Sequence, residues 1–145
     1  MEQIQEIYTD GSQKNNGKEG NGSIGIFFGD NDKRNLSEIV KNSTNNICEL
    51  TAIKRALEIY QKNCIIYTDS KYCIKCLTEW YISWLKNPKK MKDKKNIPLI
   101  KSIYDLIEKR KKEGISIELR YIKGHKGNYG NEQADKLATF YYKNN

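Results

Sequence analysis

The stretch Ile7-Tyr8-Thr9-Asp10-Gly11-Ser12 has a partial repeat about sixty residues later, in Ile66-Tyr67-Thr68-Asp69-Ser70. Each segment is rich in β-branched and aromatic residues and ends at an acid followed by a turn-forming residue. This pattern predicts a β-strand that stops at the acid. The chain between the segments is long enough for a hairpin and a helix, so the two strands can be parallel neighbours. In that register the carboxylates of Asp10 and Asp69 lie roughly 5 Å apart, which is the spacing of adjacent strands.

Two carboxylates so close together favour a divalent cation between them. Like charges at this distance destabilise one another, and a bound cation relieves the repulsion. Either acid taken alone is more simply explained as a turn residue at a strand end. The repeat favours the cation, and other acids that converge on the same place would strengthen that interpretation.

The composition indicates one folded domain, residues 1–145, with a heavily charged surface. A chain of 145 residues is long enough to bury a core. Charged residues make up 30% of it, and 26 basic against 18 acidic residues give a net charge of +8. Six lysines lie between Lys86 and Lys95. Such a basic cluster suits a polyanion such as nucleic acid, or serves only solubility.

Further features of the sequence predict an intracellular protein, in the cytoplasm or nucleus. No apolar run approaches the 18 residues of a membrane span, and the polar start at 1–3 lacks the core of a signal peptide. The four cysteines have no disulfide spacing typical of small secreted domains. The pair Cys73-x-x-Cys76 permits a zinc or redox site, but two helix positions three residues apart explain it better.

The rest of the chain is expected to contain strands and helices in alternation. A loop rich in Gly, Asn and Lys is predicted from Gln13 to Ser23, followed by two strands that form an antiparallel meander with the first. Helix N-cap residues at 42–46 predict a helix that runs to about Tyr60. The remaining elements are expected as a strand at 64–68, helices at about 72–85 and 97–113, a strand at 115–121 and a helix at about 131–142.

Two further acids are predicted to lie near Asp10 and Asp69. Glu49 shares a helix face with Ile53 and Ala56, so it is aimed inward, where the helix dipole alone does not explain an acid. Asp135 lies at the border of the buried face of the last helix. Four acids in one place form a set of hard oxygen ligands, which Mg²⁺ prefers. Two such ions about 3.5–4 Å apart can clamp the attacking and leaving oxygens of a phosphodiester.

Four motifs in order, covering essentially the whole chain, resemble those of ribonuclease H type 1. They are Tyr-Thr-Asp-Gly-Ser at 8–12, Asn-Asn-x-x-Glu-Leu-x-Ala at 45–52, Tyr-Thr-Asp-Ser at 67–70 and Gly-His-x-Gly-x-x-x-Asn-Glu-x-Ala-Asp at 124–135. The resemblance implies an RNase H-like α/β/α fold in three layers. Its five-stranded mixed sheet has three antiparallel strands first, with strands one, four and five parallel. The implied activity is endonucleolytic hydrolysis of the RNA strand of RNA/DNA hybrids, with 5′-phosphate products.

The resemblance also implies the catalytic residues. Asp10, Glu49, Asp69 and Asp135 match metal ligands, expected to hold two Mg²⁺ ions, with Mn²⁺ as a substitute. His125, the single histidine, matches a loop residue thought to assist proton transfer or product release.

The same resemblance implies a set of nucleic-acid contacts in which shape and the 2′-hydroxyl distinguish RNA from DNA. The set consists of Gly11, Ser12, Asn16, Thr44, Asn45, Asn46, Ser70, Tyr72, Trp80, Trp84, Lys89, Lys90 and Asn96. Simpler explanations stay open for several of them. The asparagines can serve turns and helix caps, and the three aromatic residues can form a core stripe. The resemblance also implies a pocket for a DNA phosphate, formed by Thr44 and Asn96. Asn42 stands at a position of this pocket where some relatives have Arg, which weakens the match.

Two alternatives remain. The first keeps the fold but gives it another task, either within a larger reverse transcriptase or as a junction resolvase. The second is a basic nucleic-acid-binding protein without catalysis. The basic cluster and the short polar N-terminus favour a free-standing monomeric enzyme with no separate hybrid-binding domain, and the presence of all four acids favours catalysis.

Overall fold

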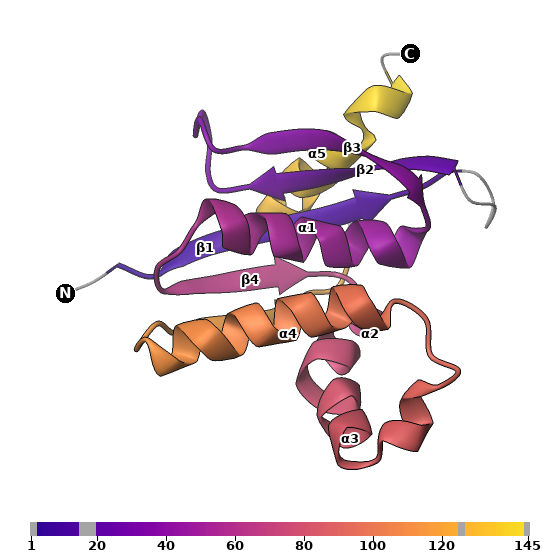
Figure 1. Ribbon diagram of the computed structural model, residues 1–145. Coiled ribbons are helices and arrows are strands. Elements are labelled where there is room, and N and C mark those ends of the chain that lie inside the picture. Colours follow the sequence, from indigo (N-terminus) through magenta and orange to yellow (C-terminus); the bar gives the residue numbers. More distant parts are fainter. Residues whose placement is uncertain (1–2, 15–19, 125–126, 144–145) are drawn as a thin grey trace.

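The computed structural model describes residues 3–14, 20–124 and 127–143, with side chains described as far as residue 140. A five-stranded sheet in the order β3-β2-β1-β4-β5 lies between helices (Figure 1). The elements are β1 (Gln5–Ser12), β2 (Gly20–Phe27), β3 (Leu36–Ser43), α1 (Asn45–Ile59), β4 (Cys64–Thr68), α2 (Lys71–Lys75), the π-helical turn η1 (Cys76–Trp80), α3 (Tyr81–Lys86), the 3-10 turn η2 (Pro88–Met91), α4 (Ile97–Lys112), β5 (Ile117–Tyr121) and α5 (Tyr129–Lys143).

The sheet has the predicted mixed topology. Strands β1, β2 and β3 are antiparallel, and β4 is parallel to both β1 and β5. Tyr8 of β1 pairs with Tyr67 of β4, which aligns the two repeated segments and confirms that they are parallel neighbours. Strand β1 does not stop at Asp10, however. It continues to Ser12 because Gly11 and Ser12 still pair with β2, whereas β4 ends just before Asp69 as expected.

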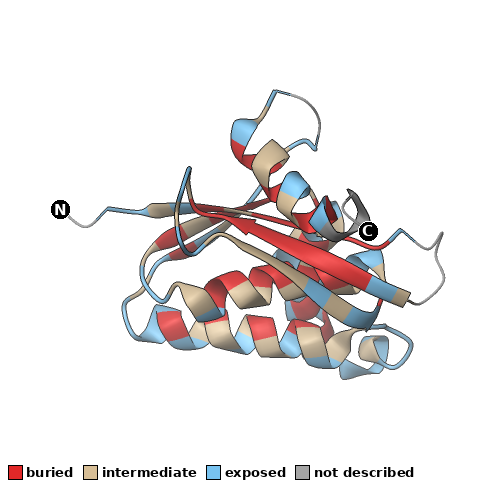
Figure 2. Ribbon diagram, turned by 90° about the horizontal axis from the view of Figure 1, so that it is seen from above, coloured by how far each residue is buried: buried red, intermediate tan, exposed pale blue. Residues whose placement is uncertain are grey.

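Helices cover both faces of the sheet. Helices α1 and α4 lie on one face and α5 on the other (Figure 1). The predicted buried stripe of α1 is confirmed at Leu50, Ile53, Ala56 and Leu57, while Tyr60 is half-buried. Figure 2 shows the buried positions concentrated along the central strands and on the sides of the helices that face the sheet. The main core therefore lies between the sheet and the α1 and α4 layer.

The opposite face holds α5 very close to the strands. Gly25 pairs with Asp10 across β1 and β2, and a Cβ at Gly25 would lie 2.1 Å from the carbonyl oxygen of Ala134 in α5. Two serines of the sheet donate to α5 carbonyls: Ser37 Oγ to Leu137 O at 2.6 Å, and Ser23 Oγ to Ala138 O. The helix that carries Asp135 is thus fixed against the strand that carries Asp10.

Several boundaries differ from the sequence-based prediction. Strand β2 begins at Gly20, inside the predicted loop, because Gly20 pairs with Ser43 beyond a register shift in the β2–β3 pair. The helix predicted at about 72–85 contains a π-helical turn, and α5 begins at Tyr129, two residues early. The four cysteines are buried and unbridged. Among the described residues, no helix has the length and apolar character needed to span a bilayer.

Candidate active site

Three of the predicted acids meet at one edge of the sheet. Asp10 comes from β1, Asp69 follows the neighbouring strand β4, and Glu49 comes from the first turns of α1. Each offers a carboxylate oxygen, and these three oxygens lie within 4.8 Å of one another. The arrangement brings together acids that are 20 to 59 residues apart in the chain.

Glu49 reaches the strands because α1 starts directly on top of β1. A Cβ at Gly11 would lie 2.4 Å from the carbonyl carbon of Cys48 and 2.5 Å from the backbone nitrogen of Glu49, so only glycine permits this approach. The start of the helix is fixed by two hydrogen bonds. Thr44 Oγ1 accepts from Ile47 N at 3.2 Å, and the side-chain oxygen of Asn45 accepts from the backbone N–H of Gln13 at 2.7 Å.

Burial and mutual repulsion make the ionised forms of the clustered acids unfavourable. Burial raises the pKa of Asp10, and the nearby Asp69 and Asp135 raise it further. Burial likewise raises the pKa of Glu49, with Asp10 and Asp69 adding to the effect. A hydrogen bond from the backbone of Gly11 lowers both values and offsets part of the cost.

One oxygen of the cluster, Glu49 Oε1, lacks a hydrogen-bond partner among the described residues and is a candidate ligand for a cation. This oxygen is buried. A buried polar atom without a partner is rare and costly. A divalent cation with oxygen ligands would satisfy this atom and relieve the repulsion among the three carboxylates. The residues present therefore fit a divalent metal ion.

Asp135 is exposed on α5 and is not one of the three acids whose oxygens lie within 4.8 Å of one another. It is nevertheless close enough to raise the pKa of Asp10. His125, the fifth predicted catalytic residue, lies outside the described residues.

Two residues at the site were quoted in the sequence motifs but given no role. Gly124, after β5, passes so close to Asp69 that a Cβ there would lie 2.4 Å from Asp69 Oδ2. Asn131 is buried in α5, and its Nδ2 donates to the same oxygen at 3.5 Å. Asn131 stands four residues before Asp135, and this spacing places two helical residues on one face. That spacing is the signal that could have found it.

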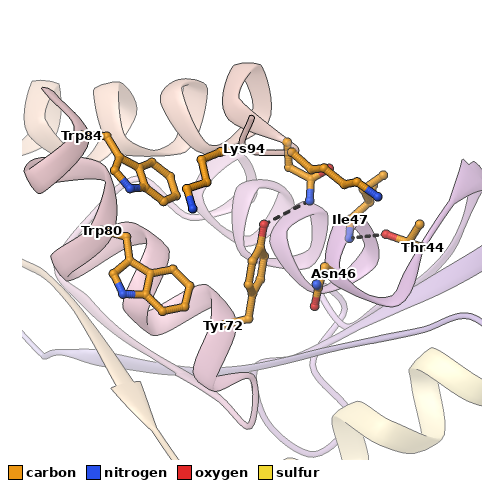
Figure 3. A pocket seen from close by; sticks show the side chains of 9 residues that line it. Thr44, Asn46, Ile47, Tyr72, Trp80, Trp84 and Lys94 are labelled. Atoms are coloured by element: carbon orange, nitrogen blue, oxygen red, sulfur yellow. Dashed lines mark hydrogen bonds between the residues drawn. The ribbon is translucent and has the colours of Figure 1, made fainter. Parts of the chain in front are cut away.

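An open groove of about 740 Å³ adjoins α1, and we call it the aromatic groove (Figure 3). Its lining contains six of the predicted nucleic-acid contacts, namely Thr44, Asn46, Tyr72, Trp80, Trp84 and Asn96, together with Ile47, Lys94 and Lys95. The ring of Trp80 lies 6.2 Å from that of Tyr72 and 6.4 Å from that of Trp84, and Lys94 Nζ lies 5.9 Å from the Trp84 ring.

The two tryptophans have different surroundings. Trp84 is 8% exposed and belongs to the core as well as to the groove, whereas Trp80 is 39% exposed. Trp80 is the last residue of the π-helical turn η1, whereas Trp84 lies in α3. The backbone N–H of Tyr81 bonds to Cys76 O, five residues back, so this turn holds one residue more than an α-helical turn. Leu77 and Tyr81 remain buried while Trp80 turns toward the groove. The core-stripe alternative therefore applies to Trp84 and is wrong for Trp80.

Two polar residues of the groove, Asn96 and Thr44, differ in the hydrogen bonds that their side chains make. Asn96 is the N-cap residue of α4, as the helix-cap explanation predicts, but it has a positive φ of 67° and its side chain makes no capping bond. Its Nδ2 instead donates to the hydroxyl of Tyr72 at 3.1 Å (Figure 3). Thr44 does cap α1, and its hydroxyl hydrogen remains available to a ligand.

The other predicted contacts are more scattered. Ser70 caps α2 by accepting from Cys73 N, and Ser12 is buried at the end of β1. Lys89 and Lys90 are exposed in η2 and do not line the aromatic groove, whereas Lys94 and Lys95 do. Asn16 lies outside the described residues.

Comparison with known proteins agrees with this geometry. The family model described as RNase H matches residues 2–141. A protein of Schizosaccharomyces pombe named Ribonuclease H is 43% identical over 140 residues, which cover 92% of this chain and 51% of that protein. The Ribonuclease H of Methylobacillus flagellatus is 40% identical over 140 residues, with 92% and 88% covered, and that of Clostridium botulinum is 36% identical over 142 residues, with 92% and 91% covered. The chain spans about half the length of the Schizosaccharomyces pombe protein. This chain belongs to the RNase H family.

Proposed function

We propose that the chain is an endoribonuclease that hydrolyses the RNA strand of RNA/DNA hybrids and leaves 5′-phosphate products. The RNase H family acts on such hybrids and depends on divalent metal ions. The observation that carries the proposal is the acidic cluster with its unpartnered Glu49 Oε1, in a chain of that family. The ligands are Asp10, Glu49, Asp69 and Asp135.

The metal is Mg²⁺, as two ions, with Mn²⁺ as a substitute. It supplies Lewis-acid chemistry, which acidifies the attacking water and neutralises charge on the leaving oxygen. The chain's own residues prepare this site. The backbone of Gly11 stabilises the ionised forms of Asp10 and Glu49, and Asn131 holds one oxygen of Asp69 from the side of α5. His125 moves a proton or assists product release.

The aromatic groove binds the DNA strand. The exposed ring of Trp80 can pack on a deoxyribose, which has no 2′-hydroxyl to be solvated, while Thr44 and Asn96 can hold a phosphate. Asn45 and Asn46 at the start of α1, with Asn16, serve the minor groove of the hybrid. The side-chain oxygen of Asn45 is already engaged by Gln13, so Asn45 contributes its amide donors.

The remaining predicted contacts complete the path of the hybrid. Gly11, Ser12 and Ser70 lie beside the acids, at the ends of β1 and β4, and serve the RNA strand. Lys89 and Lys90 contact backbone phosphates from η2. We place the enzyme inside the cell, since its four unbridged cysteines fit a reducing compartment, and expect residues 1–145 to act as one monomeric catalytic domain.

A gel assay with three labelled substrates tests the proposal. We expect the purified chain to cut the RNA strand of a hybrid, to leave duplex RNA and duplex DNA intact, and to lose all activity in EDTA. Restoring Mg²⁺ should restore cleavage, and the products should carry 5′-phosphates. Hybrid that stays intact in both Mg²⁺ and Mn²⁺ would overturn the proposal, as would equal cutting of duplex DNA.

A further inference from the structure

A lysine and a tyrosine from the segments next to Asp69 contact one another outside the aromatic groove. Lys71 Nζ lies 5.5 Å from the centre of the Tyr121 ring, and both residues are exposed, Tyr121 by 39%. A cation within about 6 Å of an aromatic ring centre is attracted by the ring. Neither residue lines the aromatic groove, although the residue that follows Lys71, Tyr72, does.

Both members of this pair are tied closely to Asp69. Lys71 follows Asp69 by two residues at the start of α2. Tyr121 is the last residue of β5 and pairs with Thr68, the residue before Asp69, and the next backbone N–H, of Ile122, donates to Thr68 O at 2.9 Å. The strand order β1-β4-β5 therefore continues the line from Asp10 and Asp69 to Tyr121 along one edge of the sheet.

Lys71 forms no ion pair with any residue that the structure describes. Other lysines on the helices form ion pairs, such as Lys75 with Glu79 at 3.5 Å and Lys101 with Asp105 at 2.6 Å. For Lys71, the part of the chain that the structure describes supplies no carboxylate partner, only the ring of Tyr121. The ring restrains the ammonium group without neutralising it, so its charge remains available to an anion that approaches the start of α2.

We propose that Lys71 binds a phosphate of the RNA strand adjacent to the scissile one, and that Tyr121 is a positioning residue that holds the ammonium group in place. The proposal rests on the proposed function. The proposed function assigns the aromatic groove to the DNA strand, so we assign Lys71, which follows Asp69 by two residues and does not line that groove, to the RNA strand. Lysine acts there as a point charge on the backbone and adds affinity without sequence preference.

Steady-state cleavage of a hybrid by Lys71→Gln tests the role of the lysine. We expect KM to rise several-fold with kcat within about twofold of the wild-type value, because the contact fixes the strand and does not enter the chemistry. The slope of log KM against log salt should fall by about one unit, the loss of one phosphate contact. Lys71→Arg should retain most of the affinity. Lys101→Gln, which removes a paired lysine on α4, is the matched control and should leave KM unchanged.

Variants of Tyr121 test whether this residue positions Lys71 or contacts the substrate itself. Tyr121→Phe keeps the ring and should behave like the wild type, whereas Tyr121→Ala should raise KM, but less than Lys71→Gln does. In the double variant the tyrosine change should add nothing further, since its effect passes through Lys71. Equal thermal melting of all variants excludes a folding defect as the cause.

Replacing single phosphates of the hybrid by neutral methylphosphonates tests which phosphate Lys71 binds. A single methylphosphonate in the RNA strand next to the cleavage site should raise KM for the wild type and have no added effect on Lys71→Gln. If only a neutral linkage in the DNA strand shows this non-additivity, the assignment to the RNA strand is overturned. A Lys71→Gln enzyme that cleaves with unchanged KM and salt slope overturns the inference while the proposed function stands. A wild-type chain that leaves the hybrid intact overturns the proposed function itself.

Discussion

The acidic cluster and the aromatic groove adjoin one another but are built on different principles. The acids lie at the ends of β1 and β4 and in the first turns of α1. Gly11 lets the backbone of β1 approach that of α1, and Gly25 lets the backbone of β2 approach that of α5. The acids are mutually repulsive, and one of their oxygens is buried without a partner. The groove is built from helical turns and the lysine-rich segment, and its polar groups already bond to one another, as Asn96 does to Tyr72. Changes in the cluster are therefore expected to alter the chemistry, and changes in the groove are expected to alter binding.

The largest effect is expected from Asp10→Asn. It removes a charged ligand from the centre of the cluster, so cleavage should fall about a thousandfold or more while hybrid affinity stays nearly unchanged. The melting temperature of the metal-free protein should rise, because a buried repulsive charge is lost. Gel cleavage, fluorescence anisotropy and thermal melting measure the three quantities. Asp105→Asn on α4 is the control. Cleavage near the wild-type rate would remove Asp10 from the mechanism.

The second test uses the two tryptophans, which share the groove but differ in burial. Trp84→Ala should destabilise the protein by about 3–5 kcal/mol, since it empties a core position. Trp80→Ala should change the free energy of unfolding by less than about 1 kcal/mol and act instead on KM, because the ring is 39% exposed. Urea unfolding together with steady-state cleavage separates the two. Equal destabilisation by both substitutions would contradict the structural difference that we describe.

A smaller effect is expected from the metal alone. Millimolar Mg²⁺ should raise the melting temperature of the wild-type protein, with a stabilisation of about 1–3 kcal/mol once the ion is well above its dissociation constant. The rise should disappear in Asp10→Asn. Differential scanning calorimetry at constant ionic strength provides the measurement. A melting curve that does not move across the Mg²⁺ series would count against a preformed site.

The smallest effect is expected from the exposed lysines of the basic cluster between Lys86 and Lys95. Replacing Lys89, Lys90 and Lys92 together by Ala should weaken hybrid binding several-fold at physiological salt and flatten its salt dependence, leaving kcat intact. Binding isotherms at four salt concentrations would show it. Lys94→Ala, which removes a lysine of the groove itself, provides the comparison. A triple variant whose salt slope equals that of the wild type would show that phosphate contacts do not extend beyond the groove.

The fold could be predicted largely from local patterns. The repeated Tyr-Thr-Asp segments pair in the register that their similarity predicts, and the apolar stripe of α1 is buried as its periodicity requires. The convergence of the acids also followed, because neighbouring parallel strands end at the same edge. Most of the groove residues were expected only from the resemblance, since their spacing alone permits a core stripe.

The parts that the sequence did not reveal depend on contacts between distant segments. The continuation of β1 past Asp10 depends on pairing with β2, and the close approach of Gly124 to Asp69 depends on where the chain passes after β5. The π-helical turn that ends at Trp80 departs from the α-helical period on which the predicted stripe relied. Each of these is a matter of a few ångströms, set by packing rather than by residue type.

The π-helical turn at Cys76–Trp80 has a consequence for how such a surface can arise. One additional residue in a helix rotates everything that follows it, without altering any side chain. In this chain the turn ends at an exposed indole, Trp80, and is followed by a buried one, Trp84. A change of one residue in the length of this turn would therefore alter which aromatic rings face the solvent, with no substitution of any side chain.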